Sequence, residues 1–181
     1  MRFLAALMTV LLLAGCGDSS ATGDDPDPAA DTAADTAFAT ELMHRDAALL
    51  NLLDVGLGRP LPRQVVMTTD QLRLDATDRM ETAADLLESW GEEVPVTARD
   101  HGAEHSSDND VPVLDGAPTG EDLQALGNLP NKEFEKDFVA LLTMSLGGTL
   151  SLAEDHEAAD ADLDALARAA AMSCQQALDA L

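Results

Sequence analysis

The chain has 181 residues, a formal net charge of −24 and only 3% aromatic residues. Charge of this sign repels nucleic acid and anionic lipid headgroups, so we expect no nucleic-acid partner. Because Tyr is absent and aromatic residues are few, Leu, Ala, Val and Met must build the core, and this composition favours packed helices over a β-sandwich.

Residues 1–16 have the pattern of an export signal that ends in a lipidated cysteine. Arg2 precedes an apolar run over residues 3–14, which is too short to span a bilayer as a helix. The small residues directly before Cys16 resemble the lipobox of bacterial lipoproteins, in which the cysteine is diacylated and the preceding segment is removed. A plain secretory signal with a chance cysteine is the alternative. We expect a signal peptide at 1–15 and a lipid anchor at Cys16 that holds the protein in the cell envelope, on the extracytoplasmic side of a membrane.

The next segment, residues 16–34, is rich in Asp, Ser, Gly and Pro and has no apolar residues that could form a core. This composition predicts a disordered acidic tether. With Cys16 acylated, Cys174 is left without a cysteine partner, so we expect no intramolecular disulfide. Small residues at helical spacing surround Cys174, which favours a buried, inert thiol over a nucleophile or metal ligand.

A first helical hairpin is predicted over about residues 35–91. Apolar residues at helical spacing indicate an amphipathic helix from about 36 to 55, and the Gly and Pro residues between 56 and 62 end it. A second helix follows from about 63 to 90, closed by Gly91. Residues 92–118 contain three prolines and no periodicity, which predicts a linker.

A second hairpin is predicted over about residues 119–181. Thr119 and Asp122 can cap a short helix, and longer helices follow from about 131 to 152 and from 161 to 180. Phe138 and Leu142 match Phe38 and Leu42 at an offset of about 100 positions. Two hairpins that cannot bury their apolar stripes alone would pack on each other, so we predict an all-α fold, a four-helix bundle built from two repeated helical hairpins.

Both halves resemble the secreted ferritin-like bundles known as domain of unknown function 305. The segments DTAFATELMHRDAALLNLL, FEKDFVALLTMSLGGTLSLAE and LDALARAAAMSCQQALDAL carry the resemblance. It implies a ferritin-like four-helix bundle and a divergent lipoprotein member of the family. The matching positions are Asp35, Phe38, Leu42, Met43 and Leu50 in the first half, and Glu135, Phe138, Leu142, Gly148, Leu150, Leu152, Ala153, Leu163, Leu166, Ala167 and Gln175 in the second.

The resemblance also raises the question of metal binding, because some members of this family are associated with copper through His and Met. The positions of the family's His-His pair are Arg45 and Asp46 in the first half and Ser145 and Leu146 in the second. Arg repels cations and Leu has no lone pair, so we expect no tightly held transition metal in the bundle core. Metal handling of the copper type is the alternative function.

Other candidate ligands lie in the predicted linker and on the first helix. Asp100, His101, Glu104 and His105 could hold a divalent metal weakly, although nothing in their sequence orders a coordination geometry. The pair Glu41 and His44 has the spacing of a di-iron ligand pair, but such a site needs a second pair, so a surface pair is the preferred interpretation.

The sequence contains no P-loop, G-x-S-x-G elbow, C-x-x-C or dinucleotide-binding fingerprint. We therefore expect no enzyme activity and no cofactor beyond that weak metal. The prediction is a lipid-anchored helical bundle that acts as a binding or interaction module, with an unknown protein partner.

Overall fold

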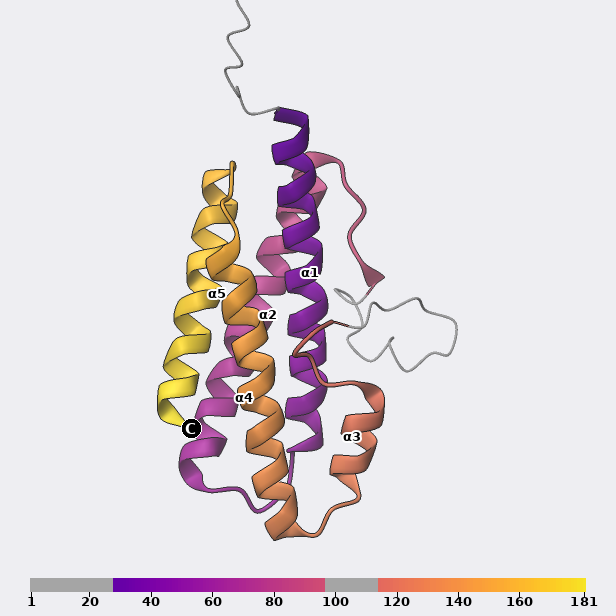
Figure 1. Ribbon diagram of the computed structural model, residues 1–181, viewed down its shortest axis with the longest axis vertical. Coiled ribbons are helices and arrows are strands. Elements are labelled where there is room, and N and C mark those ends of the chain that lie inside the picture. Colours follow the sequence, from indigo (N-terminus) through magenta and orange to yellow (C-terminus); the bar gives the residue numbers. More distant parts are fainter. Residues whose placement is uncertain (1–27, 97–113) are drawn as a thin grey trace, which may run out of the picture.

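The computed structural model describes residues 28–96 and 114–181. Its helices are α1 Pro28–Val55, α2 Arg63–Trp90, α3 Gly120–Gly127, α4 Asn131–Asp155 and α5 Ala161–Ala180. Figure 1 shows α1, α2, α4 and α5 side by side, with the short α3 at one end. No described helix combines the length and apolarity needed to cross a membrane.

The bundle consists of two antiparallel hairpins, α1 with α2 and α4 with α5. The hairpins pack so that α1 lies against α4 and α2 lies against α5 (Figure 1). The short α3 lies near the end of the bundle opposite to the end of α2, and α2 and α4 run in the same direction. A single long crossover of this kind is typical of ferritin-like bundles. The predicted all-α fold is confirmed.

The helix bounds agree with the sequence except at the start of α1. The predicted ranges 63–90 and 161–180 are those of α2 and α5, and α4 runs three residues beyond the predicted 152. The predicted disordered tether over 16–34 is wrong for its last part, because α1 already begins at Pro28. Proline is favoured in the first turn of a helix, and the alanines after it have the highest helix propensity. The part of the tether before Pro28 lies outside the described residues.

The predicted helix caps are present. Gly91 ends α2 with a φ of 77°, and its amide donates to the carbonyl of Glu88. Thr119 and Asp122 form a reciprocal capping box at α3, and the hydrogen bonds from Thr119 lower the pKa of Asp122. A further cap, which was not among those predicted, is at the start of α5, where the Asp160 side chain accepts from two backbone amides. These local contacts explain why the helix ends could be read from the sequence.

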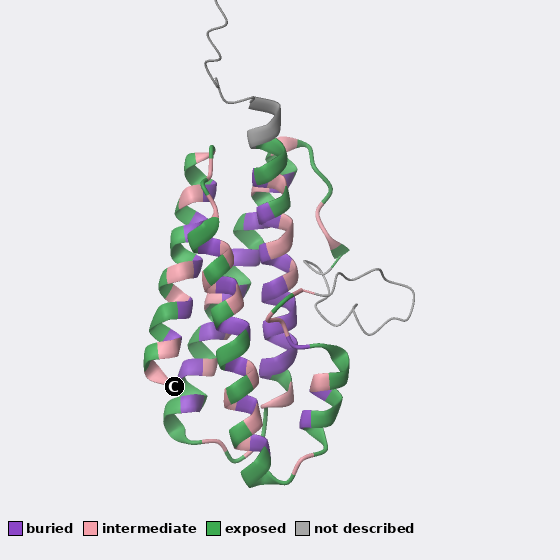
Figure 2. Cartoon of the chain, in the orientation of Figure 1, coloured by how far each residue is buried: buried purple, intermediate pink, exposed green. Residues whose placement is uncertain are grey.

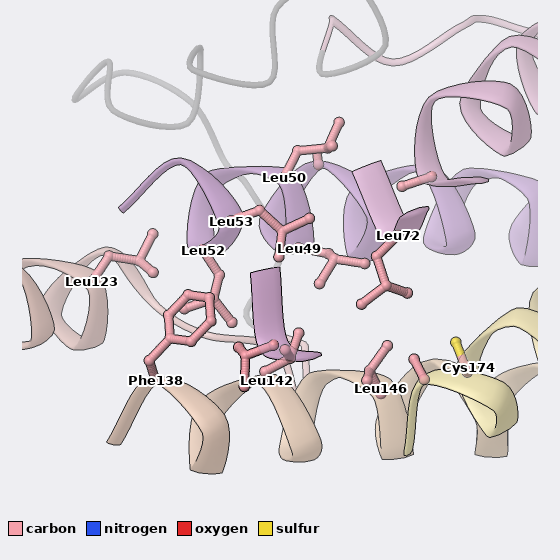
Figure 3. Close-up of a cluster of buried hydrophobic side chains, with 14 of the residues drawn as sticks. Leu49, Leu50, Leu52, Leu53, Leu72, Leu123, Phe138, Leu142, Leu146 and Cys174 are labelled. Atoms are coloured by element: carbon pink, nitrogen blue, oxygen red, sulfur yellow. The ribbon is translucent and has the colours of Figure 1, made fainter. Parts of the chain in front are cut away.

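The core has the repeated register that the sequence predicts. Phe38 and Leu42 in the first hairpin are buried, and so are Phe138 and Leu142 in the second. Figure 2 shows the buried residues along the inward faces of the long helices, and Figure 3 shows Phe138 and Leu142 facing the leucines of α1. The Phe138 ring stacks on Phe134 with centroids 5.5 Å apart. The two hairpins therefore share one interior and depend on each other for burial.

Candidate functional site

A buried ion pair joins α1 to α2 inside the bundle. Asp46 is fully buried, and its carboxylate accepts hydrogen bonds from Arg79 Nε at 3.0 Å and Arg79 Nη2 at 2.5 Å. Burial raises the pKa of Asp46, and the Arg79 guanidinium opposes this shift. Burial would lower the pKa of Arg79, but the Asp46 carboxylate outweighs it, so the pKa is raised and Arg79 stays cationic. This bidentate geometry suits two charged partners that hold the helices in register.

Cys174 lies close to this pair, on α5. The thiol is buried, and burial raises its pKa to about 11, with the Arg79 guanidinium acting in the opposite direction. A thiol with such a pKa stays protonated at neutral pH and is a poor nucleophile. The predicted buried, inert thiol agrees with this environment.

A groove of about 710 Å³ runs between α1 and α4, which we call the α1/α4 groove. Small residues of α1 and α4 line its walls, so the two helices do not pack tightly there. The apolar part of the lining is Ala34, Ala37, Phe38 and Leu152, and Gly116 and Gly148 lie at the far end from Ala34. The helices thus leave an open furrow because their facing side chains are too short to fill it.

Arg45 closes one end of the α1/α4 groove. Its Nε and Nη2 bond Glu41 at 2.9 and 2.8 Å, and its Nη1 donates to the carbonyl of Asp115 at 2.9 Å. The Arg45 side chain is only 9% exposed, against 37% for Glu41. All three guanidinium nitrogens therefore have partners within the chain, and the more accessible charge is the carboxylate.

The position of the Arg45 guanidinium depends on the absence of a side chain at Gly148. A Cβ on Gly148 would lie 2.7 Å from Arg45 Nη1 and 3.2 Å from the Asp115 carbonyl, whereas a Cβ on the adjacent Gly147 would meet nothing within 4 Å. Replacing Gly by Ala within an exposed helix gains about 1 kcal/mol from propensity. A hydrogen bond to a charged group is worth roughly 1.5–3 kcal/mol. The steric loss at Gly148 should thus exceed the propensity gain.

We expect Gly147→Ala to raise the free energy of unfolding by up to about 1 kcal/mol, and Gly148→Ala to lower it by about 1 kcal/mol. Chemical denaturation of the two variants measures the difference. Stabilisation of equal size in both variants would show that Arg45 is not held against Gly148.

A contact between α1 and the α4–α5 turn closes the other end of the groove. His156 Nε2 lies 3.1 Å from Asp35 Oδ1, and the His156 ring stacks on Phe38 with centroids 4.1 Å apart. Asp35 also accepts from the backbone amides of Ala159 and Asp160. This buried carboxylate therefore fixes the turn after α4 onto α1 and places the aromatic pair at the groove wall.

A second furrow, between α2 and α5, has smaller spaces of about 440 and 300 Å³. Asp75 is at its centre, but both oxygens of this carboxylate accept hydrogen bonds within the chain, from Gln71 Nε2 at 2.7 Å and from Ser173 Oγ at 2.6 Å. The α1/α4 groove is larger and more apolar, so it is the stronger candidate for a binding site.

The comparisons with known proteins agree with the bundle. The family profile described as "Domain of unknown function (DUF305)" matches residues 35–180. The chain belongs to the DUF305 family. Among solved structures, the chain is similar to a DUF305 fragment from Deinococcus radiodurans, with a TM-score of 0.65 and 18% identity, over 81% of this chain and 91% of that one. No curated protein matches the chain.

In this DUF305 chain, the four positions at which the resemblance implied histidines hold residues with ionic or core contacts. Arg45 and Asp46 take part in the two ion pairs described above, and Ser145 and Leu146 are buried in α4. Over residues 28–96 and 114–181, no group of three or more His, Cys, Asp and Glu side chains gathers as a metal ion would require. The expectation that the bundle core holds no tightly bound transition metal stays a prediction.

The remaining predicted site residues are only partly within the structure. Cys16 lies outside the described residues, and so do the four linker candidates, Asp100, His101, Glu104 and His105. Glu41 and His44 are both on α1, where Glu41 binds Arg45, and burial lowers the pKa of His44 while Glu41 opposes this shift. Both residues are partly exposed, and the interpretation of a surface pair stays a prediction.

Sequence reasoning missed the contact between Asp35 and His156, the role of Arg79 and the α1/α4 groove. One signal was present for the groove, since adjacent glycines inside a helical pattern indicate close approach of another segment. The partners of Asp35 and Asp46 had no such signal, because they come from other helices.

Proposed function

We propose that this protein is anchored by lipid at Cys16 on the extracytoplasmic side of a membrane and acts by binding a ligand in the α1/α4 groove. The groove carries the proposal, because it is an open space held between two well-packed helices. Its volume of about 710 Å³ falls in the range of small-molecule sites, roughly 300–1,000 Å³. The proposal assigns the groove no catalytic step.

The lining of the groove combines apolar surface with a few polar groups, as ligand-binding sites do. Phe38 and Leu152 supply apolar surface, whereas Glu41, Asp155 and His156 supply polar groups at the edges. Apolar surface contributes most of the affinity in such sites, and a few fixed polar groups select the ligand. The contact of Arg45 with Glu41 and that of Asp35 with His156 hold these two polar groups in place before a ligand arrives, which reduces the entropy cost of binding.

The anchor has its own test. We expect Cys16→Ser to release the protein from the membrane fraction, because diacyl attachment is what would hold it there. Cys174→Ser is the matched control and should stay with the membrane. The measurement is the distribution of the protein between the membrane and soluble fractions after cell lysis. Equal retention of both variants would contradict the anchor at Cys16.

The groove is tested by filling it. Ala37 is exposed and lines the groove, so Ala37→Trp should occupy the space without entering the core. Ala140→Trp is the control, since Ala140 is exposed on α4 and outside the groove lining. Ligand-observed NMR with a set of small aromatic and aliphatic compounds should give binders of the parent protein and of Ala140→Trp that Ala37→Trp loses. Binders that persist in Ala37→Trp would move the site elsewhere.

A further inference from the structure

We infer that the ligand of the α1/α4 groove is an organic cation with an apolar body, such as an aryl-alkyl ammonium. This inference rests on the proposed function and adds the chemical class of the ligand. It depends on which charges of the groove a ligand can reach.

Among the described residues that line the groove, acidic residues outnumber cationic ones. They are Glu41, Asp115 and Asp155, against the guanidinium of Arg45. That guanidinium is nearly buried, and each of its nitrogens already bonds Glu41 or the Asp115 carbonyl. Among the described lining residues, an anionic ligand would thus find the Arg45 guanidinium already engaged and would meet the carboxylates of Glu41 and Asp155.

His156 does not change this balance. Its Nε2 lies 3.1 Å from Oδ1 of the buried Asp35 carboxylate, so this nitrogen already has a partner within the chain. One face of the His156 ring is covered by Phe38, which stacks on it. The His156 and Phe38 pair therefore adds ring surface to the groove wall, and the preference for a ligand charge rests on the carboxylates of Glu41 and Asp155.

The net charge of the whole protein also favours a cationic ligand. The formal net charge of −24 draws cations toward the whole surface. The groove differs from that surface by its apolar lining of Ala34, Ala37 and Leu152, which a simple inorganic cation cannot use. Charge and apolar surface together thus select a ligand that has both.

The experiment compares three compounds with the same apolar body: 3-phenylpropylammonium, 3-phenylpropan-1-ol and 3-phenylpropionate. Their affinities for the purified protein are measured by titration at low ionic strength. We expect the ammonium compound to bind at least about tenfold more tightly than the alcohol, with the carboxylate weakest, because partly exposed carboxylates attract a nearby cation. Added salt should reduce the difference.

Two variants separate the groove from the general charge of the surface. Ala37→Trp keeps every charge, so it should weaken the ammonium compound at least about tenfold only if the compound enters the groove. Asp155→Asn removes one groove carboxylate and should weaken it several-fold, whereas Glu154→Gln removes a neighbouring exposed charge outside the lining and should not. Asp155→Asn keeps the test valid if Ala37→Trp fails to fold.

The outcomes distinguish this inference from the proposed function. Suppose that the alcohol or the carboxylate binds as tightly as the ammonium compound and loses affinity in Ala37→Trp. The groove then binds ligands, but the inference that its ligand is a cation is wrong. If the ammonium compound binds Ala37→Trp and the parent equally, or if Asp155→Asn and Glu154→Gln weaken it equally, surface charge explains the binding and the inference is overturned.

Discussion

Asp46→Asn is expected to lower the free energy of unfolding by about 3–5 kcal/mol, because it leaves the Arg79 guanidinium buried without a counter-charge. Arg79 is only 4% exposed, although it borders the space between α2 and α5. Its Nη1 is already buried without a hydrogen-bond partner among the described residues, so the bonds to Asp46 are what offset the cost of burying the charge. Chemical denaturation measures the loss.

The control for this variant is Asp164→Asn. Asp164 pairs with Arg168 on the surface of α5, with side chains 45% and 66% exposed, and exposed pairs contribute at most about 1 kcal/mol. Replacing both buried partners, as Asp46→Leu with Arg79→Met, should cost less than Asp46→Asn alone, since no charge then remains buried. A loss below about 1 kcal/mol in Asp46→Asn would mean that Arg79 finds water or another partner.

Phe138→Ala is expected to lower the free energy of unfolding by about 3–5 kcal/mol, because it leaves a cavity between the two hairpins. The ring is fully buried and stacks on Phe134. It also presses on the end of α1, since a Cβ on Gly56 would lie 2.9 Å from the ring. The side chain therefore has contacts on both hairpins that Ala cannot replace.

Leu74→Ala is the control for Phe138→Ala. Leu74 is 62% exposed on α2, and surface substitutions away from special features usually change stability by less than about 0.5 kcal/mol. Circular dichroism during chemical denaturation measures both variants. If Phe138→Ala costs less than about 1 kcal/mol, the repeated register of the two hairpins is wrong.

The two main features of the bundle have different physical roles. The pair of Asp46 and Arg79 lies inside the bundle with all described carboxylate bonds directed at the guanidinium, which suits it to holding α1 and α2 in register. The α1/α4 groove lies on the outside of the bundle and keeps its charges partly exposed. Stability variants at Asp46 and binding variants at Ala37 should thus act on separate properties.

The amino-acid sequence by itself determined the helices, their caps and the hairpin repeat. These features depend on local chemistry, such as the Thr119 cap, the Gly91 stop and the spacing of Phe138 and Leu142. The early start of α1 at Pro28 was missed because acidic, Pro-containing segments have the composition of a tether even where alanines support a helix.

Only the tertiary structure decided which polar residues meet and where space is left. Asp46 and Arg79 are 33 positions apart, and Asp35 and His156 are 121 apart, so no local pattern relates them. Their contacts depend on the rotation and height of helices that pack through other residues. The groove has the same origin, because small residues such as Ala37 and Gly148 leave a space only where another helix fails to fill it.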